Sequence, residues 1–136
     1  MADAERLRSR IIEILEEADS QPPQESVPLS FVVIGGGPTG VEIAGAIGDL
    51  LQCTPVQIFK HANLRDASVT LIDHAPTVLG PFGSKSRLYA QTKLQERGVR
   101  LLMGASVSEV QPSHVVLSDG ATIAAHLVIW AGGLKA

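Results

Sequence analysis

Apolar and polar positions follow their most regular pattern between Leu29 and Leu51. Residues 31–34 are all apolar and include two adjacent valines, which predicts a short strand buried on both faces. Glycines at 35–37 end this run. From Pro38 onward, apolar residues recur at the spacing of one helix face. The stretch therefore predicts a strand, a glycine turn and a helix, in that order.

The same alternation continues in the next segment of the chain. Residues 69–72 predict a second buried strand, which Asp73 ends. Residues 75–83 are rich in glycine and proline, so they predict a loop over the carboxyl end of the sheet.

A second helix is expected to begin at Ser84 or Ser86, either of which could cap it, and to run to Arg97. Gly98 is its stop signal, and a third strand follows at 99–103. We expect three side chains of this helix to face the sheet, namely Leu88, Ala90 and Leu94.

After the third strand the pattern becomes purely β. Three short strand-like pieces are expected at 106–110, 115–117 and 122–124. Asp119-Gly120 between the last two is a hairpin-turn signal. Residues 127–130 predict a final buried strand that runs parallel beside the first. Together the elements predict an α/β, Rossmann-like, doubly wound parallel sheet with a three-stranded antiparallel meander as one crossover.

Two further segments are less regular. Residues 3–18 predict an amphipathic helix, and the proline-rich segment 20–28 predicts a linker. The helix has one apolar face, which includes Leu7, Ile11, Ile14 and Leu15. This domain, another chain or a missing part of the protein must cover that face. Residues 54–68 fit either a helix after a break at Pro55 or a surface loop.

Composition excludes several classes of function. A length of 136 residues suits one domain, and a net charge of −3 gives no basic footprint for nucleic acid. We find neither a bilayer-length apolar run nor a secretory pattern, so we expect a cytoplasmic chain without membrane contact. Cys53 is the only cysteine, so no internal disulfide is expected. The four histidines lack metal-ligand spacing, so no metal site is expected.

The glycines after the first strand have a spacing with chemical meaning. Gly35, Gly37 and Gly40 match G-x-G-x-x-G. In a dinucleotide site the first permits the tight turn, the second lets a pyrophosphate approach the backbone, and the third lets the helix pack closely. Free amides of the first helical turn would hold the phosphates, and Pro38 fits there because its missing N–H is not needed. The alternative is a tight turn that binds nothing.

Asp73 ends the strand that is expected beside the glycine turn. A carboxylate there can accept hydrogen bonds from the adenosine ribose and repel the 2′-phosphate of NADP(H). The distance from glycines to acid exceeds the usual spacing of about 20 residues. An insertion at 54–68 would account for the difference. The alternative is a strand-end carboxylate or helix cap.

Four segments together resemble one family: residues 31–45 (FVVIGGGPTGVEIAG), 69–79 (VTLIDHAPTVL), 94–102 (LQERGVRLL) and 127–133 (LVIWAGG). They are similar to the NAD(P)H-binding domain of the FAD-dependent pyridine nucleotide-disulfide oxidoreductase superfamily. The GGGPTGVE form and the WAGG ending resemble type II NADH dehydrogenases, which are NADH:quinone oxidoreductases.

The resemblance implies a set of cofactor-binding residues. The pyrophosphate would lie on the glycine turn and the adenosine ribose on Asp73. Glu42 and Gly132 would lie at the nicotinamide end, and a protonated His74 would lessen the rejection of NADP(H). The implied residues are Gly35, Gly36, Gly37, Pro38, Thr39, Gly40, Glu42, Asp73, His74 and Gly132. No catalytic residue is implied in this chain, because nicotinamide and flavin supply the chemistry.

The resemblance also implies that the polypeptide is cut out of a larger flavoprotein. Residues 1–28 would be a helix and linker from the junction with a missing FAD domain, and 29–136 the NAD(H)-binding domain. The fragment would bind NADH weakly, carry no FAD and be inactive alone. Its parent would pass a hydride from NADH to FAD and then to quinone, as a peripheral protein on the cytoplasmic membrane face. Leu7, Ile11 and Leu15 could then mediate a homodimer.

Two alternatives stay open on the residues alone. The parent could be a related reductase whose electrons go to a disulfide, ferredoxin or nitrite. The chain could instead be a nucleotide-binding module without catalysis.

Overall fold

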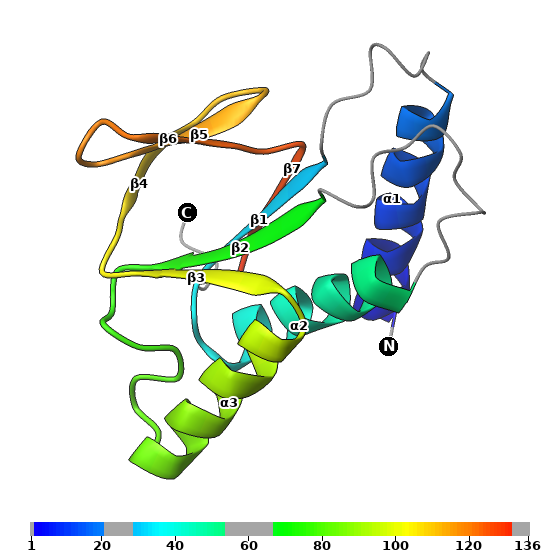
Figure 1. The fold of residues 1–136 in the computed structure, drawn as a ribbon. Helices are drawn as coiled ribbons and strands as arrows, with labels where there is room; N and C mark the ends of the chain where they lie inside the picture. The colour runs from blue at the N-terminus through cyan, green and yellow to red at the C-terminus, as the bar shows by residue number, and fades with distance from the viewer. Residues whose placement is uncertain (1, 21–28, 54–66, 132–136) are drawn as a thin grey trace.

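The structure is a computed structural model that describes residues 2–20, 29–53 and 67–131. At its centre four parallel strands lie in the order β3-β2-β1-β7 (Figure 1). They are β1 (Ser30–Ile34), β2 (Ser68–Asp73), β3 (Val99–Met103) and β7 (Leu127–Trp130). All four predicted strands are confirmed, and β7 runs parallel beside β1 as expected.

Two helices cover one face of this sheet. Helix α2 (Pro38–Cys53) follows β1, and helix α3 (Ser84–Glu96) lies between β2 and β3. Successive side chains of a strand point to opposite faces. In β1, Phe31 and Val33 are therefore buried in the core that contains residues of the helices, whereas Val32 belongs to a second core on the other face.

That second face is covered by a separate antiparallel sheet, which Figure 1 shows on the opposite side from α2 and α3. Its strands are β4 (Val107–Val110), β5 (His114–Leu117) and β6 (Thr122–Ala124). Val115 and Leu117 of β5 are buried with Val32 and Ile72 of the parallel sheet. Since the meander connects β3 to β7, it is the predicted β crossover, and the predicted α/β class is confirmed. The second face thus carries a meander instead of helices.

The turn inside the meander follows its sequence signal. Gly120 has φ of +92°, a conformation that L-residues other than glycine rarely adopt. The amide of Ala121 donates a hydrogen bond of 2.9 Å to Asp119 Oδ1. This closed turn separates β5 from β6, which confirms the expected hairpin.

The N-terminal helix α1 (Ala2–Asp19) packs into the helix-side core of the same chain. Ile11 is 2% exposed and Leu15 is 0% exposed, and both belong to the cluster that contains Phe31 and Ile47. The apolar face of this helix is therefore covered by its own domain. The predicted homodimer contact through Ile11 and Leu15 is wrong for this reason, and the side chain of Leu7 lies outside the described residues.

Two expectations for α3 are also wrong. The N-cap residue is Gly83, without a side-chain cap hydrogen bond, and Ser84 is already the first helical residue. Leu88 is 63% exposed instead of facing the sheet. Ala90 and Leu94, one turn apart, do face the core, and Leu88 lies about 200° around the helix from Ala90. The helix ends at Glu96, and Gly98 with φ of +80° provides the expected stop.

Helices α2 and α3 meet closely near their carboxyl ends. A Cβ added to Gly48 would lie 2.6 Å from the carbonyl oxygen of Arg97, so only glycine fits this contact. The side chain of Gln52 donates to the carbonyl of Glu96 at 3.2 Å. An ion pair of 3.2 Å joins Arg97 to Asp49, and because both side chains are about half exposed it contributes only about 0–1 kcal/mol.

Among the helices in the described ranges, none combines the length and the apolar character that a bilayer span requires.

The packing of α1 can be tested with one core truncation. Leu15→Ala removes a fully buried side chain, so we expect it to lower the free energy of unfolding by about 2–5 kcal/mol. Leu88→Ala is the matched control, because the exposed Leu88 should change stability by no more than about 0.5 kcal/mol. Urea titration followed by circular dichroism measures both. Equal stability of the two variants would contradict the packing of α1 on this core.

Candidate functional site

The glycine turn lies where β1 ends and α2 begins. Gly35 has φ of +119°, a conformation that a side chain would strain. Its amide donates a hydrogen bond of 2.8 Å to the carbonyl of Ile72, so the turn is tied to the end of β2. The first motif glycine, Gly35, therefore forms the tight turn that follows β1.

The other two motif glycines differ in what surrounds them. A Cβ on Gly40 would overlap the carbonyl oxygen of Gly35, so α2 begins in direct contact with the turn. A Cβ on Gly37 would meet no heavy atom within 4 Å. The space over Gly37 is thus open, and we call this space, beside the glycine turn and the first turn of α2, the cradle.

The first turn of α2 presents amide groups to this cradle. The amide of Val41 donates to the carbonyl of Gly37 at 3.0 Å, whereas the amides that begin a helix have no acceptor inside it. Pro38 has no amide hydrogen, and Pro38 and Thr39 are exposed. The first turn holds no acidic residue, so no carboxylate there opposes an anion at the positive end of the helix.

Asp73 lies directly against the glycine turn. A Cβ added to Gly36 would come within 3.1 Å of Asp73 Oδ2 and 3.2 Å of its Cβ. The Asp73 side chain is only 18% exposed. His74 follows, with Nδ1 at 3.5 Å from Asp73 Oδ1 and a side chain that is 82% exposed. The structure therefore brings the acid that the sequence singled out to the edge of the cradle.

The end of β7 approaches the cradle from the other side. The amide of Ala131 donates to the carbonyl of Ile34 at 2.7 Å. The Cβ of Ala131 would lie 3.4 Å from a Cβ placed on Gly40. Trp130 is 57% exposed at this edge. Gly132, which the sequence assigned to the nicotinamide end, lies outside the described residues.

The loop after β2 adds a contact that sequence reasoning missed. Leu79 donates its amide to the carbonyl of Gly36 at 2.8 Å and has a positive φ of +53°. The amide of Phe82 then bonds to the carbonyl of Leu79 at 2.9 Å, and Phe82 is 46% exposed. Only the Gly80-Pro81 pair hinted at a turn here. The loop therefore stabilises the glycine turn through a hydrogen bond between their backbones.

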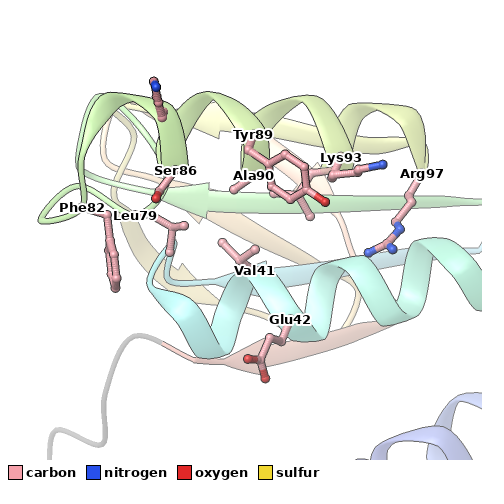
Figure 2. A pocket seen from close by; sticks show the side chains of 11 residues that line it. Val41, Glu42, Leu79, Phe82, Ser86, Tyr89, Ala90, Lys93 and Arg97 are labelled. Carbon is pink, nitrogen blue, oxygen red and sulfur yellow. The ribbon is translucent and has the colours of Figure 1, made fainter.

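A groove of about 750 Å³ lies between α2 and α3 beside this loop (Figure 2). Val41, Leu79 and Ala90 are among the residues that line it. Figure 2 shows Glu42 pointing away from α3. Glu42, a predicted site residue, is among the residues that line the groove, whereas the motif glycines and Asp73 are not, so the groove adjoins the cradle without including it. Within the described ranges no cluster of three metal-ligating side chains occurs.

The first strand is followed by G-x-G-x-x-G at a helix N-terminus, and an acid ends the next strand of the parallel sheet; this arrangement is that of a Rossmann-like fold. The chain belongs to the pyridine nucleotide-disulphide oxidoreductase family, whose model matches residues 3–136.

Curated relatives place the chain among known sequences of this family. It is 39% identical over 140 residues to the type II NADH:quinone oxidoreductase Ndh of Mycobacterium tuberculosis, covering 98% of this chain and 30% of that protein. It is 40% identical over 107 residues to a mitochondrial internal alternative NAD(P)H-ubiquinone oxidoreductase A1 of Solanum tuberosum, covering 78% of this chain and 21% of that protein. The chain thus spans less than a third of the length of these relatives.

A solved structure shows the same fold. The NDH2 of Plasmodium falciparum in complex with NADH matches with a TM-score of 0.83 and 22% identity, over 97% of this chain and 28% of the other. At that identity the match supports the architecture of sheet, helices and meander.

Gly37 and Gly40, the second and third motif glycines, allow a matched test of the turn. Gly40→Ala forces a methyl group onto the Gly35 carbonyl, so we expect a loss of about 1–3 kcal/mol of unfolding free energy or more. Gly37→Ala places its methyl group in open space and should stay within about 0.5 kcal/mol of the parent. Thermal and urea unfolding measure the difference. A Gly40→Ala variant as stable as Gly37→Ala would contradict the close contact.

Proposed function

We propose that this chain is the NADH-binding domain of a flavin-dependent NADH:quinone oxidoreductase of type II. The observation that carries the proposal is the open main-chain cradle over Gly37 with Asp73 packed at its edge. The identity to type II NADH:quinone oxidoreductase Ndh, at 39% over nearly the whole chain, supports the choice within the family.

The dinucleotide fits the cradle part by part. Its pyrophosphate would lie on the amides of the glycine turn and of the first turn of α2, over Gly37 and Thr39. The adenosine ribose would bond to Asp73. Glu42, exposed and turned away from α3, would lie toward the nicotinamide end together with Gly132.

This placement separates the role of the chain's residues from the chemistry of the cofactors. When bound, nicotinamide supplies a hydride and flavin accepts it, with quinone as the final acceptor. The chain's own residues bind and orient the nucleotide, and none is assigned as a general acid or base. Residues 29–136 would form the NAD(H)-binding domain, and 1–28 the junction toward the FAD-binding part of the parent. The threefold greater length of the relatives leaves room for that part.

A related ferredoxin reductase is the second candidate for the parent. The ferredoxin reductase from Rhodopseudomonas palustris matches with a TM-score of 0.61 and 24% identity over 77% of this chain. The greater coverage of the NADH:quinone oxidoreductases favours quinone as the final acceptor.

Calorimetric titration tests the binding site. We expect ADP-ribose and NADH to bind the chain saturably, because the cradle and Asp73 contact the shared ADP-ribose part. Gly37→Ala should weaken ADP-ribose binding by about tenfold or more, since its methyl group occupies the phosphate position.

Gly80→Ala is the matched control, because a Cβ there also meets nothing within 4 Å but lies outside the cradle. The proposal fails if neither nucleotide binds, or if the two variants lose affinity equally.

Asp73→Asn tests the ribose assignment. The change removes the negative charge that repels a 2′-phosphate and leaves the shape of the side chain nearly intact. We expect the ratio of NADH affinity to NADPH affinity to fall by about tenfold. Competition titrations with both dinucleotides measure it, and an unchanged ratio would argue against contact between Asp73 and the ribose.

A further inference from the structure

We propose that Leu79 is a positioning residue of this site, whose backbone orients the Gly36–Gly37 peptide so that the Gly37 amide meets the pyrophosphate of the nucleotide. The inference rests on the proposed function, because it concerns the phosphates that the glycine turn would hold. It gives the loop after β2 a role in phosphate binding that acts through the backbone of Leu79 and not through its side chain.

Leu79 holds a backbone conformation that its residue type disfavours. Its φ is +53°, and in the described ranges no other residue besides glycine has a positive φ. A side chain in this left-handed region crowds its own backbone, so such a residue persists only where its surroundings hold it there. Residues held in this way cluster at functional sites.

Two backbone hydrogen bonds hold Leu79 in place. Its amide donates to the carbonyl of Gly36 at 2.8 Å, and its carbonyl accepts from the amide of Phe82 at 2.9 Å. Its side chain packs against the helix-side core and lines the groove between α2 and α3 (Figure 2). The first of the two bonds joins the loop directly to the glycine turn.

The bond to the Gly36 carbonyl also sets the direction of the next amide. The C=O and N–H groups of a trans peptide lie in one plane and point in opposite directions. Because the Gly36 carbonyl is directed at the amide of Leu79, the Gly37 N–H points away from that amide. Among the residues that the structure describes, none accepts a hydrogen bond from the Gly37 amide. A bound phosphate could therefore take this N–H as a donor.

The same bond engages a carbonyl that α2 could otherwise use. A helical amide bonds to the carbonyl four residues earlier, as the amide of Val41 does with Gly37 at 3.0 Å. The matching acceptor for the Gly40 amide is the Gly36 carbonyl, which Leu79 engages instead. In the described ranges the Gly40 amide likewise has no acceptor. This pattern leaves two nearby amides to bind an anion at the positive end of the helix.

Two substitutions separate the backbone of Leu79 from its side chain. Leu79→Gly removes the side chain but favours a positive φ, whereas Leu79→Ile keeps the number of carbons and strongly disfavours that φ. We expect Leu79→Gly to bind ADP-ribose within about twofold of the parent chain, and Leu79→Ile to bind it about tenfold more weakly. Calorimetric titration of the 136-residue chain measures both. A role of side-chain packing alone would reverse this order.

A third variant removes only the hydrogen-bond donor and does not depend on the folding of Leu79→Ile. Semisynthesis replaces the Leu79 amide by an ester and keeps the leucine side chain. We expect its affinity for ADP-ribose to fall by about fivefold. Adenosine is the control ligand, because it keeps the ribose expected on Asp73 and has no phosphate. Its affinity, followed by the NMR shift of the Asp73 amide, should stay within about twofold of the parent value.

Three results would overturn the role of Leu79 and leave the proposed function standing. The first is an affinity for ADP-ribose in Leu79→Ile that equals or exceeds that of Leu79→Gly. The second is an ester variant that binds ADP-ribose like the parent chain. The third is an ester variant that loses affinity for ADP-ribose and adenosine equally, as a general loosening of the fold would produce. Failure of ADP-ribose to bind the parent chain would overturn both proposals.

Discussion

The site depends on the close approach of helix α2 to the end of β1. Gly40 has no side chain where a Cβ would overlap the Gly35 carbonyl, so the helix begins against the turn itself. That contact leaves the first-turn amides beside the open cradle over Gly37. A methyl group at position 40 would push the helix away from the turn, and the positive end of the helix would then lie farther from the cradle.

The parallel register brings the remaining parts to the same edge. Ile34, Ile72 and Trp130 occupy matching positions at the carboxyl ends of β1, β2 and β7. The residue after each of these strand positions therefore enters the site region, as Asp73 does after Ile72. Leu79 then ties the following loop back to the turn through the carbonyl of Gly36. Under the proposed function, binding would thus rest mainly on backbone atoms, with Asp73 at the edge of the turn.

Much of this arrangement could be predicted from the residues. Short apolar runs predicted the buried strands. The glycine spacing predicted which turn would have no side chains over its backbone. Asp119-Gly120 predicted the hairpin because its conformation is a local property of those residues. The position of Asp73 could also be predicted, because the second strand of a βαβ unit pairs in parallel with the first and so ends beside the glycine turn.

Other features depend on contacts that no local pattern contains. Leu88 was expected to face the sheet, but α3 has no strong apolar stripe, and Ala90 and Leu94 take the buried side. The sequence left open whether this domain, another chain or a missing part of the protein covers the apolar face of α1. The structure places Ile11 and Leu15 in the core around Phe31, so this domain covers it. The backbone contact of Leu79 arises from a positive φ that its residue type does not predict.

Amide-resolved NMR of the chain during titration with ADP-ribose tests the central claim most directly, because it reports where on the backbone the nucleotide binds. The account predicts that the largest shifts fall on the amides of the glycine turn and the first turn of α2 that carry a hydrogen (Gly35, Gly36, Gly37, Thr39 and Gly40) and on that of Asp73, while the groove between α2 and α3 stays unchanged. Shifts confined to that groove, to the meander or to no region at all would contradict it.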